Sequence, residues 1–365
     1  MNYAHFRSEL SALQILENPL IIKHILGVIH SNRKNSEGLY ESTFAVCSAF
    51  AQGRSFLESG ETASPRTQPV MFYYGLLNYA KGCIALSSLG GRKQMASYKH
   101  GVSTPRKKSR YNYFSDAIRV EKTGVFPDWY EAVQLLRRKA HHPGSTDFLD
   151  ADPGKHGLGK SGTLNSVLSG ATFPVDQLWA TVPGTWPVLG ELGISPRYER
   201  LAVISANYSQ TSYSVQRGWA ARCGLPFETL IELLRSHDSG TSISSIEFPP
   251  TNIETQSIVL ETDSSGKIAS HDWWIPTISE IHDQTMAIPP LPQHLLKSAS
   301  LSEPFVQYLL AFHLSMLSRY EPEHWGDLVN DEASVEFLMM AILAKRIATT
   351  TSAFYGRLLL PFLDH

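Results

Sequence analysis

The chain has 365 residues, of which 42% are hydrophobic and 18% are charged. These proportions are typical of a folded globular protein and exclude a disordered or fibrous chain. Lysine and arginine together number 32 against 34 aspartate and glutamate residues, which gives a net charge of −2. A chain so close to neutral has no overall attraction to nucleic acid or to an anionic membrane, so such binding would need a local basic patch. The length suits two domains, or one domain with a large insertion.

The sequence shows no sign of a disulfide framework, a cysteine-based metal site or a membrane anchor. Cys47, Cys83 and Cys223 are odd in number and lie at no metal-type spacing, so we expect reduced thiols in the core. The N-terminus lacks the basic and apolar pattern of a signal peptide. The most apolar windows, 70–89 and 305–317, are interrupted by polar residues or too short to span a membrane. We therefore expect a cytoplasmic protein that does not bind membranes.

Three helices are predicted in the first quarter of the chain. Apolar residues recur at three- and four-residue spacing over 8–31, where Pro19 is a break, and again over 39–58. A third helix over 70–88 follows Pro69, and proline suits the first turn of a helix. This third helix is apolar on nearly every side, so we expect it at the centre of a helical bundle.

Residues 92–111 form a predicted loop, because glycines and Pro105 flank and interrupt the segment. One interpretation is a solvated connection. The other is a loop that contacts phosphate, because many basic residues lie close together in a chain of balanced charge. The phosphate contacts would come from His100, Arg106, Lys107, Lys108 and Arg110.

The chain after this loop alternates between short elements. We predict a strand over 117–120, a turn at Gly124 and an amphipathic helix over 129–136. Residues 139–162 look irregular, and 164–194 contain a short helix followed by a loop rich in glycine and proline. From residue 199 the period becomes that of strands. The elements expected there are strands over 201–205, 242–248 and 257–262, a hairpin turn at 263–266 and one helix over 226–235.

Helical patterns return near the C-terminus, at 291–299, 304–319, 322–330, 333–348 and 351–362. The expected fold is therefore mainly α with an inserted α+β segment, and its helical bundle is built from the N- and C-terminal regions. The expected division is residues 1–98 plus 291–365 as the helical bundle, 99–198 as a mixed, loop-rich connection, and 199–290 as a small α+β or β segment.

The stretch Gly154-Lys-His-Gly-Leu-Gly-Lys-Ser161 matches the phosphate-binding pattern G-x-x-x-x-G-K-[ST]. In such a loop Lys160 would reach the terminal phosphates of a nucleotide and Ser161 would hold magnesium. A phosphate-binding loop follows a buried strand, whereas residues 141–153 contain two prolines and three aspartates. A glycine-rich surface loop is the competing interpretation, and nucleotide binding is the weaker functional alternative.

The densest cluster of charged and aromatic residues follows the predicted helix 304–319. Arg319 and His324 are separated by four residues. An arginine can hold a phosphate in a forked contact, and a histidine can exchange a proton near neutral pH, so the two are candidate catalytic residues for phosphodiester chemistry. Pro322 disfavours helix at Glu321 and suits the first turn of a new helix, so the two side chains would flank a bend.

The competing interpretation of this bend is structural. Arg319 would pair with a nearby carboxylate, and the bend would be held by packing rather than built for chemistry. Candidate carboxylates are Glu321, Glu323 and Asp327, and the residues assigned to the bend itself are Tyr320, Glu321, Pro322 and Trp325. His313 lies on the apolar face of the preceding helix and is predicted to be a core histidine. The histidine spacings support no metal site, and we predict no cofactor.

Three short patches resemble the YaaC-like bacterial proteins: Pro69-Val-Met-Phe-Tyr-Tyr-Gly-Leu-Leu-Asn-Tyr-Ala-Lys81, Lys99-His-Gly-Val-Ser103 and Ser315-Met-Leu-Ser-Arg-Tyr-Glu-Pro-Glu-His-Trp325. That family is largely uncharacterised. The helices 39–58 and 70–88 also resemble, more weakly, the HEPN class of helical domains. This second resemblance implies a dimer that cuts RNA without a metal, with an arginine–histidine motif that falls on Arg319 and His324. The two functional expectations are therefore RNA binding or metal-independent RNA cleavage by a homodimer, and a non-enzymatic scaffold.

Overall fold

The computed structural model describes residues 13–31, 38–88, 99–104, 113–141, 168–195, 199–206, 210–216, 255–261, 278–281, 284–287, 301, 303–330 and 334–363. The chain divides into two compact units, residues 1–175 with 307–365, and residues 176–306. The first unit carries most of the helices and all the candidate site residues that the structure describes.

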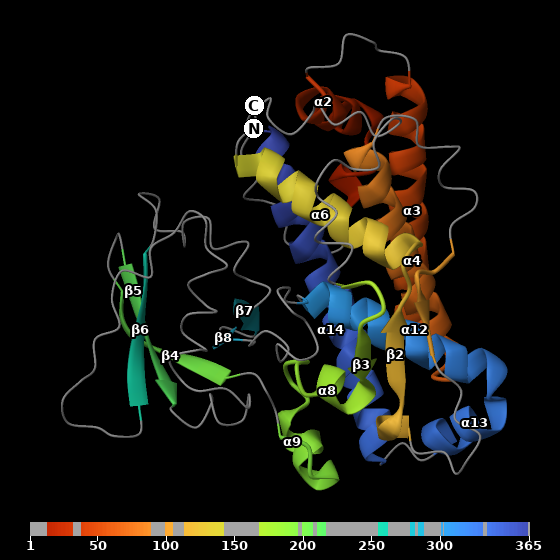
Figure 1. Ribbon diagram of the computed structural model, residues 1–365, viewed down its shortest axis with the longest axis vertical. Coiled ribbons are helices and arrows are strands. Elements are labelled where there is room, and N and C mark those ends of the chain that lie inside the picture. Colours follow the sequence, from red (N-terminus) through yellow and green to blue (C-terminus); the bar gives the residue numbers. More distant parts are fainter. Residues whose placement is uncertain are drawn as a thin grey trace. The chain divides into compact units, whose positions relative to one another are not determined.

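The N-terminal part of the chain forms helices where the apolar spacing predicts them (Figure 1). Helix α2 spans Pro19–Ile29, α3 spans Leu39–Thr62 and α4 spans Gln68–Ser87. The predicted break at Pro19 is confirmed, because residues 13–15 are helical, a turn follows at 16–17, and Pro19 begins α2. The side chain of Asn18 accepts a hydrogen bond from the Leu20 N–H. Helix α4 buries residues on nearly every side, as its composition predicts.

The C-terminal part contains α12 (Glu303–Tyr320), α13 (Pro322–Asn330), α14 (Val335–Leu359) and the short 3₁₀ helix η4 (Leu360–Leu363). The prediction of two separate helices over 333–348 and 351–362 is wrong, because α14 is continuous through residue 350. Its hydroxyl side chains stay compatible with the helix by bonding back to carbonyls in the preceding turn. Thr350 Oγ1 donates to Arg346 O at 2.7 Å and Thr351 Oγ1 to Ile347 O at 2.6 Å.

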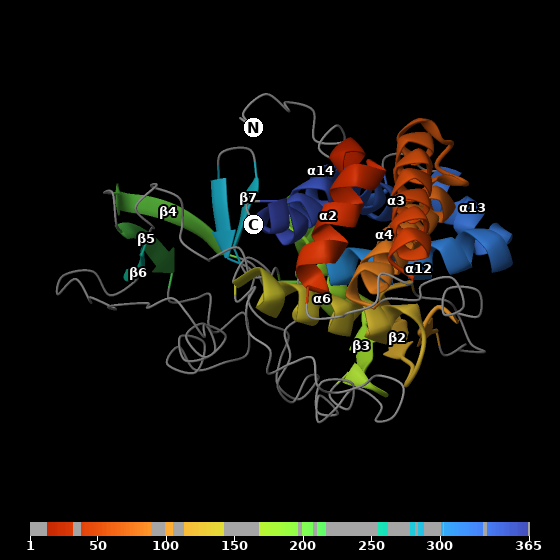
Figure 2. The ribbon, with the colours of Figure 1, turned by 90° about the horizontal axis from the view of Figure 1, so that it is seen from above.

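The helical bundle is built from both ends of the chain, as predicted. Helix α14 packs against α3 and α4, and α2 packs against η4 (Figure 2). An aromatic cluster joins these elements: the Tyr79 ring of α4 stacks on Tyr355 of α14 at 5.0 Å between centroids, and Phe50 of α3 lies 5.5 Å from Tyr79. All three side chains are buried, so residues from distant parts of the sequence share one core.

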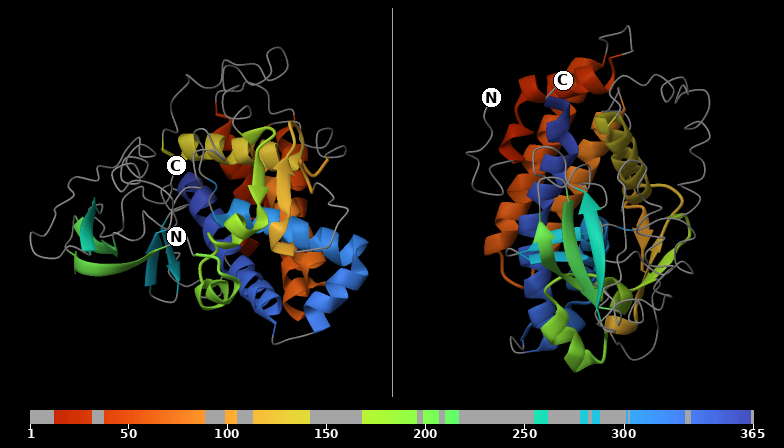
Figure 3. Two further views of the ribbon diagram at one scale, coloured as in Figure 1. Left: turned by 60° about the horizontal axis from the view of Figure 1, so that its bottom comes forward. Right: turned by 90° about the vertical axis from the view of Figure 1, so that its left-hand side faces the viewer.

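A small antiparallel sheet and one further helix complete the first unit (Figure 3). Strand β1 (Val102–Ser103) pairs with β2 (Ala117–Val120), which pairs with β3 (Thr172–Pro174). A 3₁₀ turn, η1 (Tyr113–Ser115), precedes β2. Helix α6 (Val125–His141) follows the turn at Gly124 and packs against α4 and α14. The predicted strand 117–120 is confirmed, and the predicted helix 129–136 is the middle of the longer α6.

The second unit contains the inserted sheet. It is a five-stranded antiparallel sheet in the order β6-β5-β4-β8-β7. The strands are β4 (Glu199–Ala206), β5 (Gln210–Gln216), β6 (Thr255–Glu261), β7 (Ile278–Ile281) and β8 (Gln284–Ala287). Two short helices, α8 (Val175–Trp179) and α9 (Trp186–Leu189), and the 3₁₀ turn η2 (Gly190–Leu192) precede them. Strands β4 and β6 fall on predicted strands.

Several predicted features lie outside the described residues. They are the helices 226–235 and 291–299, the strand 242–248, the turn 263–266, the Gly154–Ser161 stretch, and the basic residues Arg106, Lys107, Lys108 and Arg110.

One described stretch, Val335–Leu363, is long and apolar enough to cross a membrane. The core helix of a soluble protein meets the same test, and α14 contributes core side chains to the bundle. These are Met339, Leu343, Ile347, Tyr355, Leu358 and Leu359. The expectation that the protein does not bind membranes stays a prediction.

The close contact between α3 and α4 yields a test of the packing. A Cβ atom at Gly75 would lie 2.5 Å from Cδ2 and 2.8 Å from Cγ of the buried Leu57. We expect Gly75→Ala to lower the free energy of unfolding by about 1–3 kcal/mol, because the added methyl group forces the fully buried Leu57 side chain to shift. Denaturant titration measures this change.

Gly27 of α2 supplies the matched control, since a Cβ atom there meets nothing within 4 Å. Gly27→Ala should raise the stability by up to about 1 kcal/mol through helix propensity. A Gly75→Ala protein as stable as the Gly27→Ala protein would contradict this account of the α3–α4 contact.

Candidate functional site

The bend between α12 and α13 forms as the sequence predicts. Helix α12 ends at Tyr320, and α13 begins at Pro322. Glu321 bridges the two helices, because its N–H donates to Leu317 O and its carbonyl accepts from the Trp325 N–H, both at 2.9 Å. The proline therefore turns the chain without leaving these backbone groups unpaired.

Arg319 lies in the last turn of α12 and points back along that helix. Its Nε donates to the Ser315 carbonyl at 3.0 Å, and its Nη1 lies 3.4 Å from the Tyr74 hydroxyl of α4. The guanidinium also lies 5.1 Å from the centroid of the Tyr320 ring and 5.9 Å from that of Tyr74. Among the described residues no carboxylate pairs with Arg319, so the expected ion pair with a neighbouring acid does not form.

His324 lies on the other side of the bend, in the first turn of α13. Its side chain is 52% exposed, and Nδ1 lies 3.4 Å from Glu321 Oε2. Tyr320 is exposed, whereas Trp325 is buried and its Nε1 donates to Arg66 O at 3.1 Å. None of the hydrogen bonds or ion pairs of Arg319 involves His324.

The structure instead places His100 where the charge of Arg319 lowers its pKa. His100 precedes β1, and its backbone is held at the start of α6: Lys99 O accepts from the Val125 N–H at 2.9 Å, and His100 O from the Phe126 N–H at 3.2 Å. These two bonds satisfy donors at the helix N-terminus. The backbone around Gly101 approaches the backbone around Gly124 so closely that both positions require glycine. A Cβ atom at Gly124 (φ +131°) would lie 2.5 Å from the Gly101 backbone.

The ring of His100 is fixed by tyrosines from two helices. Its Nδ1 lies 2.6 Å from the hydroxyl of Tyr73 in α4. The Tyr73 hydroxyl lies 3.4 Å from that of Tyr308 in α12, and Tyr308 donates to His100 O at 3.4 Å. Phe312, one turn further along α12, also contacts both the His100 and Tyr73 rings. Residues 308, 312 and 319 lie along one side of α12, at helical spacing.

Burial and two basic side chains lower the pKa of His100. Burial of the ring is the largest cause, followed by Arg319 and then by Lys81 of α4. Burial also lowers the pKa of Lys81. No hydrogen bond or ion pair of Lys81 is found with any described residue. Arg319 and Lys81 thus both act electrostatically on His100, and no described carboxylate pairs with either cation. A basic group of this kind favours a bound anion.

Sequence reasoning therefore found part of this group. It singled out Arg319 and His100 separately but missed their proximity, and it missed Tyr73, Lys81 and Tyr308. One signal for Lys81 was present, since it is the only charged side chain in the otherwise apolar stretch 70–88. Nothing in the local pattern distinguishes the two tyrosines from other core aromatic residues.

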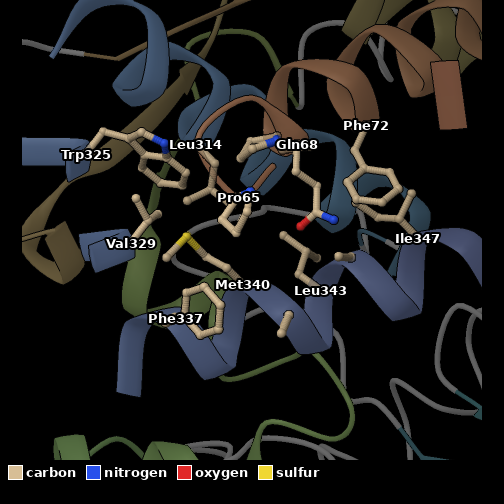
Figure 4. Close-up of a pocket in the computed structure, with 14 residues that line it drawn as sticks. Pro65, Gln68, Phe72, Leu314, Trp325, Val329, Phe337, Met340, Leu343 and Ile347 are labelled. Carbon is tan, nitrogen blue, oxygen red and sulfur yellow. The ribbon is translucent and has the colours of Figure 1, made fainter. Parts of the chain in front are cut away.

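A separate apolar cavity of about 40 Å³ lies between α4, α12, α13 and α14 (Figure 4). Trp325 and Phe337 line it, with aliphatic side chains of α14. Small-molecule sites typically measure about 300–1,000 Å³, so this cavity does not suit a nucleotide. It contains neither Arg319 nor His100, and the basic group lies outside it.

The two described cysteines and His313 are packed into the core. Burial raises the pKa of the Cys47 thiol to about 11, and it also raises that of Cys83, so both thiols are inert. No three described histidine, cysteine, aspartate or glutamate side chains lie close enough together to hold a metal ion. His313 is buried, which confirms it as a core histidine.

The fold and site together define a mainly helical protein with a basic, tyrosine-lined site between helices from the two ends of the chain. Residues 6–351 match the YaaC-like protein family. The chain therefore belongs to the YaaC-like family. No curated protein and no solved structure matches it.

The burial of His313 produces a pH dependence of stability. Its ring stacks on Tyr113, and its Nε2 lies 3.4 Å from Asp116 Oδ2 without forming a hydrogen bond to it. Burial lowers the pKa of His313 to about 4 because the desolvation outweighs this long contact. Unfolded histidine binds a proton below about pH 6.5. Between these two values the unfolded state holds the extra proton, so acid favours unfolding.

We therefore expect the free energy of unfolding to fall as the pH drops from 6.5 to 4, with His313 contributing on the order of 3 kcal/mol to the fall. His313→Phe keeps a ring against Tyr113 and removes the titrating group. Its stability should fall less than that of the natural chain over the same range in denaturant titrations. Identical pH dependence in the two proteins would exclude His313 as the cause.

Proposed function

We propose that the group formed by Lys81, His100 and Arg319 binds the phosphate backbone of single-stranded RNA. The observation that carries this proposal is the partly buried Arg319, which pairs with no described carboxylate and whose charge, with that of Lys81, lowers the pKa of His100. Burying charge without a partner is costly, and a bound phosphate would supply the missing negative charge.

The surroundings of Arg319 favour nucleic acid over a small anion. Exposed Tyr320 and partly buried Tyr74 place aromatic rings beside the guanidinium, and unstacked bases bind to such rings. In the sequence, Arg106, Lys107, Lys108 and Arg110 follow His100 within ten positions and extend the run of basic residues. A single strand could thus place one phosphate at Arg319 and a base at the neighbouring rings.

Metal-independent RNA cleavage is the more specific form of this proposal. It is supported by the resemblance of α3 and α4 to HEPN domains and by the arginine–histidine spacing of Arg319 and His324. In this form Arg319 is the phosphate clamp and a histidine transfers the proton. A homodimer and a cytoplasmic location are part of the same proposal. Nucleotide binding at Gly154–Ser161 stays a weaker prediction.

The competing proposal is a scaffold that works only by binding other proteins. Exposed apolar side chains favour it: Leu20 is 77% exposed, Tyr40 74% and Phe44 40%, and the last two rings lie 4.7 Å apart on α3. Large exposed apolar groups of this kind are common at protein interfaces. A scaffold would need no basic site, so RNA binding separates the two proposals.

We expect Arg319→Ala to weaken RNA binding by about ten- to a hundredfold, the value of charge-assisted hydrogen bonds to a phosphate. Fluorescence anisotropy with a labelled single-stranded RNA measures the dissociation constant. Lys81→Met should also weaken binding and should reduce the slope of log affinity against log salt by about 0.7, as expected when one phosphate contact is lost.

Lys345→Ala is the matched control, because Lys345 is an exposed basic residue on α14 that is absent from the proposed site. It should bind RNA like the natural chain. If the natural chain does not bind RNA, or if Arg319→Ala and Lys345→Ala have equal affinities, the RNA-binding proposal is wrong and the scaffold proposal is favoured.

A further inference from the structure

The contacts of His100 determine which of its ring nitrogens carries the proton. Three contacts close a ring: His100 Nδ1 to the Tyr73 hydroxyl at 2.6 Å, Tyr73 to the Tyr308 hydroxyl at 3.4 Å, and Tyr308 to the His100 carbonyl at 3.4 Å. The carbonyl can only accept. Each tyrosine has one proton to donate, and burial raises both tyrosine pKa values, so both phenols stay protonated.

Only one arrangement of protons fills all three contacts. Nδ1–H of His100 donates to Tyr73, Tyr73 donates to Tyr308, and Tyr308 donates to the His100 carbonyl. If Tyr73 instead donated to Nδ1, no proton would remain for the Tyr73–Tyr308 contact, because Tyr308 already donates its proton to the His100 carbonyl. The complete arrangement places the imidazole proton on Nδ1 and leaves a lone pair on Nε2.

The other ring nitrogen is available to a substrate. Nε2 bonds to no described residue, and it is not sealed from solvent. Among the described residues, the titratable and charged groups around the ring are Tyr73 and Lys81 from α4 and Tyr308 and Arg319 from α12. Helix α6 contributes the Phe126 N–H to the backbone. The two charged groups are both basic and lower the pKa of His100, so the ring is neutral at neutral pH.

We propose that His100 Nε2 is the general base of metal-independent RNA cleavage and removes the proton from a 2′-hydroxyl whose neighbouring phosphate is held by Arg319. Tyr73 and Tyr308 are positioning residues that fix the tautomer of His100. The inference rests on the proposed RNA binding, and it assigns the base to a different histidine from the one suggested by the Arg319–His324 spacing.

The reaction balances with water as the only other participant. The 2′-oxygen forms a bond to phosphorus as its proton passes to His100 Nε2, and the bond from phosphorus to the 5′-oxygen breaks. The leaving 5′-oxygen takes a proton from water, and His100 returns its proton to the hydroxide that remains. Arg319 stabilises the negative charge on the phosphate oxygens. The products are a 2′,3′-cyclic phosphate and a 5′-hydroxyl, so DNA would bind without being cut.

The test uses the full chain, an end-labelled single-stranded RNA, excess EDTA and a denaturing gel. We expect the natural chain to produce cyclic-phosphate ends and to leave the matching DNA intact. His100→Ala, purified identically and checked for folding by circular dichroism, should lose at least a hundredfold in kcat at saturating RNA. Lys345→Ala should cut at the natural rate, which controls for the effect of a substitution as such, while the identically purified His100→Ala protein controls for contaminating nucleases.

Tyr73→Phe and Tyr308→Phe test the positioning role with milder changes. Each should lower kcat about five- to tenfold with little change in KM, because the lost hydrogen bond no longer favours the Nδ1–H tautomer. In the natural chain kcat should rise with pH through the lowered pKa of His100 and then level off. In Tyr73→Phe the pH at which kcat rises should differ from that of the natural chain. A purely structural role of Tyr73 would leave this pH unchanged.

The outcomes separate this inference from the proposed function. If the natural chain binds no RNA, both fail. If it binds RNA but does not cut it in EDTA, or if His100→Ala cuts at the natural rate, the base assignment is wrong and RNA binding stands. Loss of cutting in His324→Ala together with full cutting in His100→Ala would assign the proton transfer to His324 instead.

Discussion

The contact of Tyr73 with Tyr308, Phe312 and His100 is the interaction on which the candidate site and the middle of the bundle depend. It joins α4, α12 and the segment before β1, so one side chain connects residues 235 positions apart in the sequence. Tyr73 is fully buried, and burying an aromatic ring contributes about 2–3 kcal/mol to the free energy of folding. Its hydroxyl needs a partner in this interior, and His100 supplies it. The same packing that closes the core therefore fixes the orientation of the histidine.

This arrangement explains why basic groups can gather where no described carboxylate balances them. Arg319 keeps part of its surface in contact with solvent, donates to the Ser315 carbonyl and lies against two tyrosine rings. These contacts offset part of the cost of removing a guanidinium from water without neutralising its charge. A positively charged site that is already assembled loses little conformational entropy on binding an anion. Structural arginines in protein interiors usually have a carboxylate partner, and its absence among the described residues is the reason to propose a function for Arg319.

The sequence predicts the elements better than the contacts between them. Helices over 39–58, 70–88 and 304–319 and the bend at Pro322 follow from apolar spacing and proline stereochemistry, which are local properties. The continuity of α14 was missed because hydroxyl residues weaken a helix in isolation, whereas packing on α3, α4 and α6 favours it in the fold. The proximity of His100 to Arg319 was also missed. It depends on how α4, α6 and α12 meet, and no local periodicity specifies the contacts between helices.

The arginine–histidine spacing shows why a motif must be judged in three dimensions. Residues five positions apart on one continuous α-helix point about 140° apart, so this spacing alone does not bring two side chains together. Here Pro322 ends α12 between the two residues. The Arg319 side chain runs back to Ser315, while His324 turns to Glu321 in the first turn of α13. The bend that seemed to bring the two residues together gives their side chains different partners. Within one chain Arg319 acts instead on His100, whose pKa it lowers.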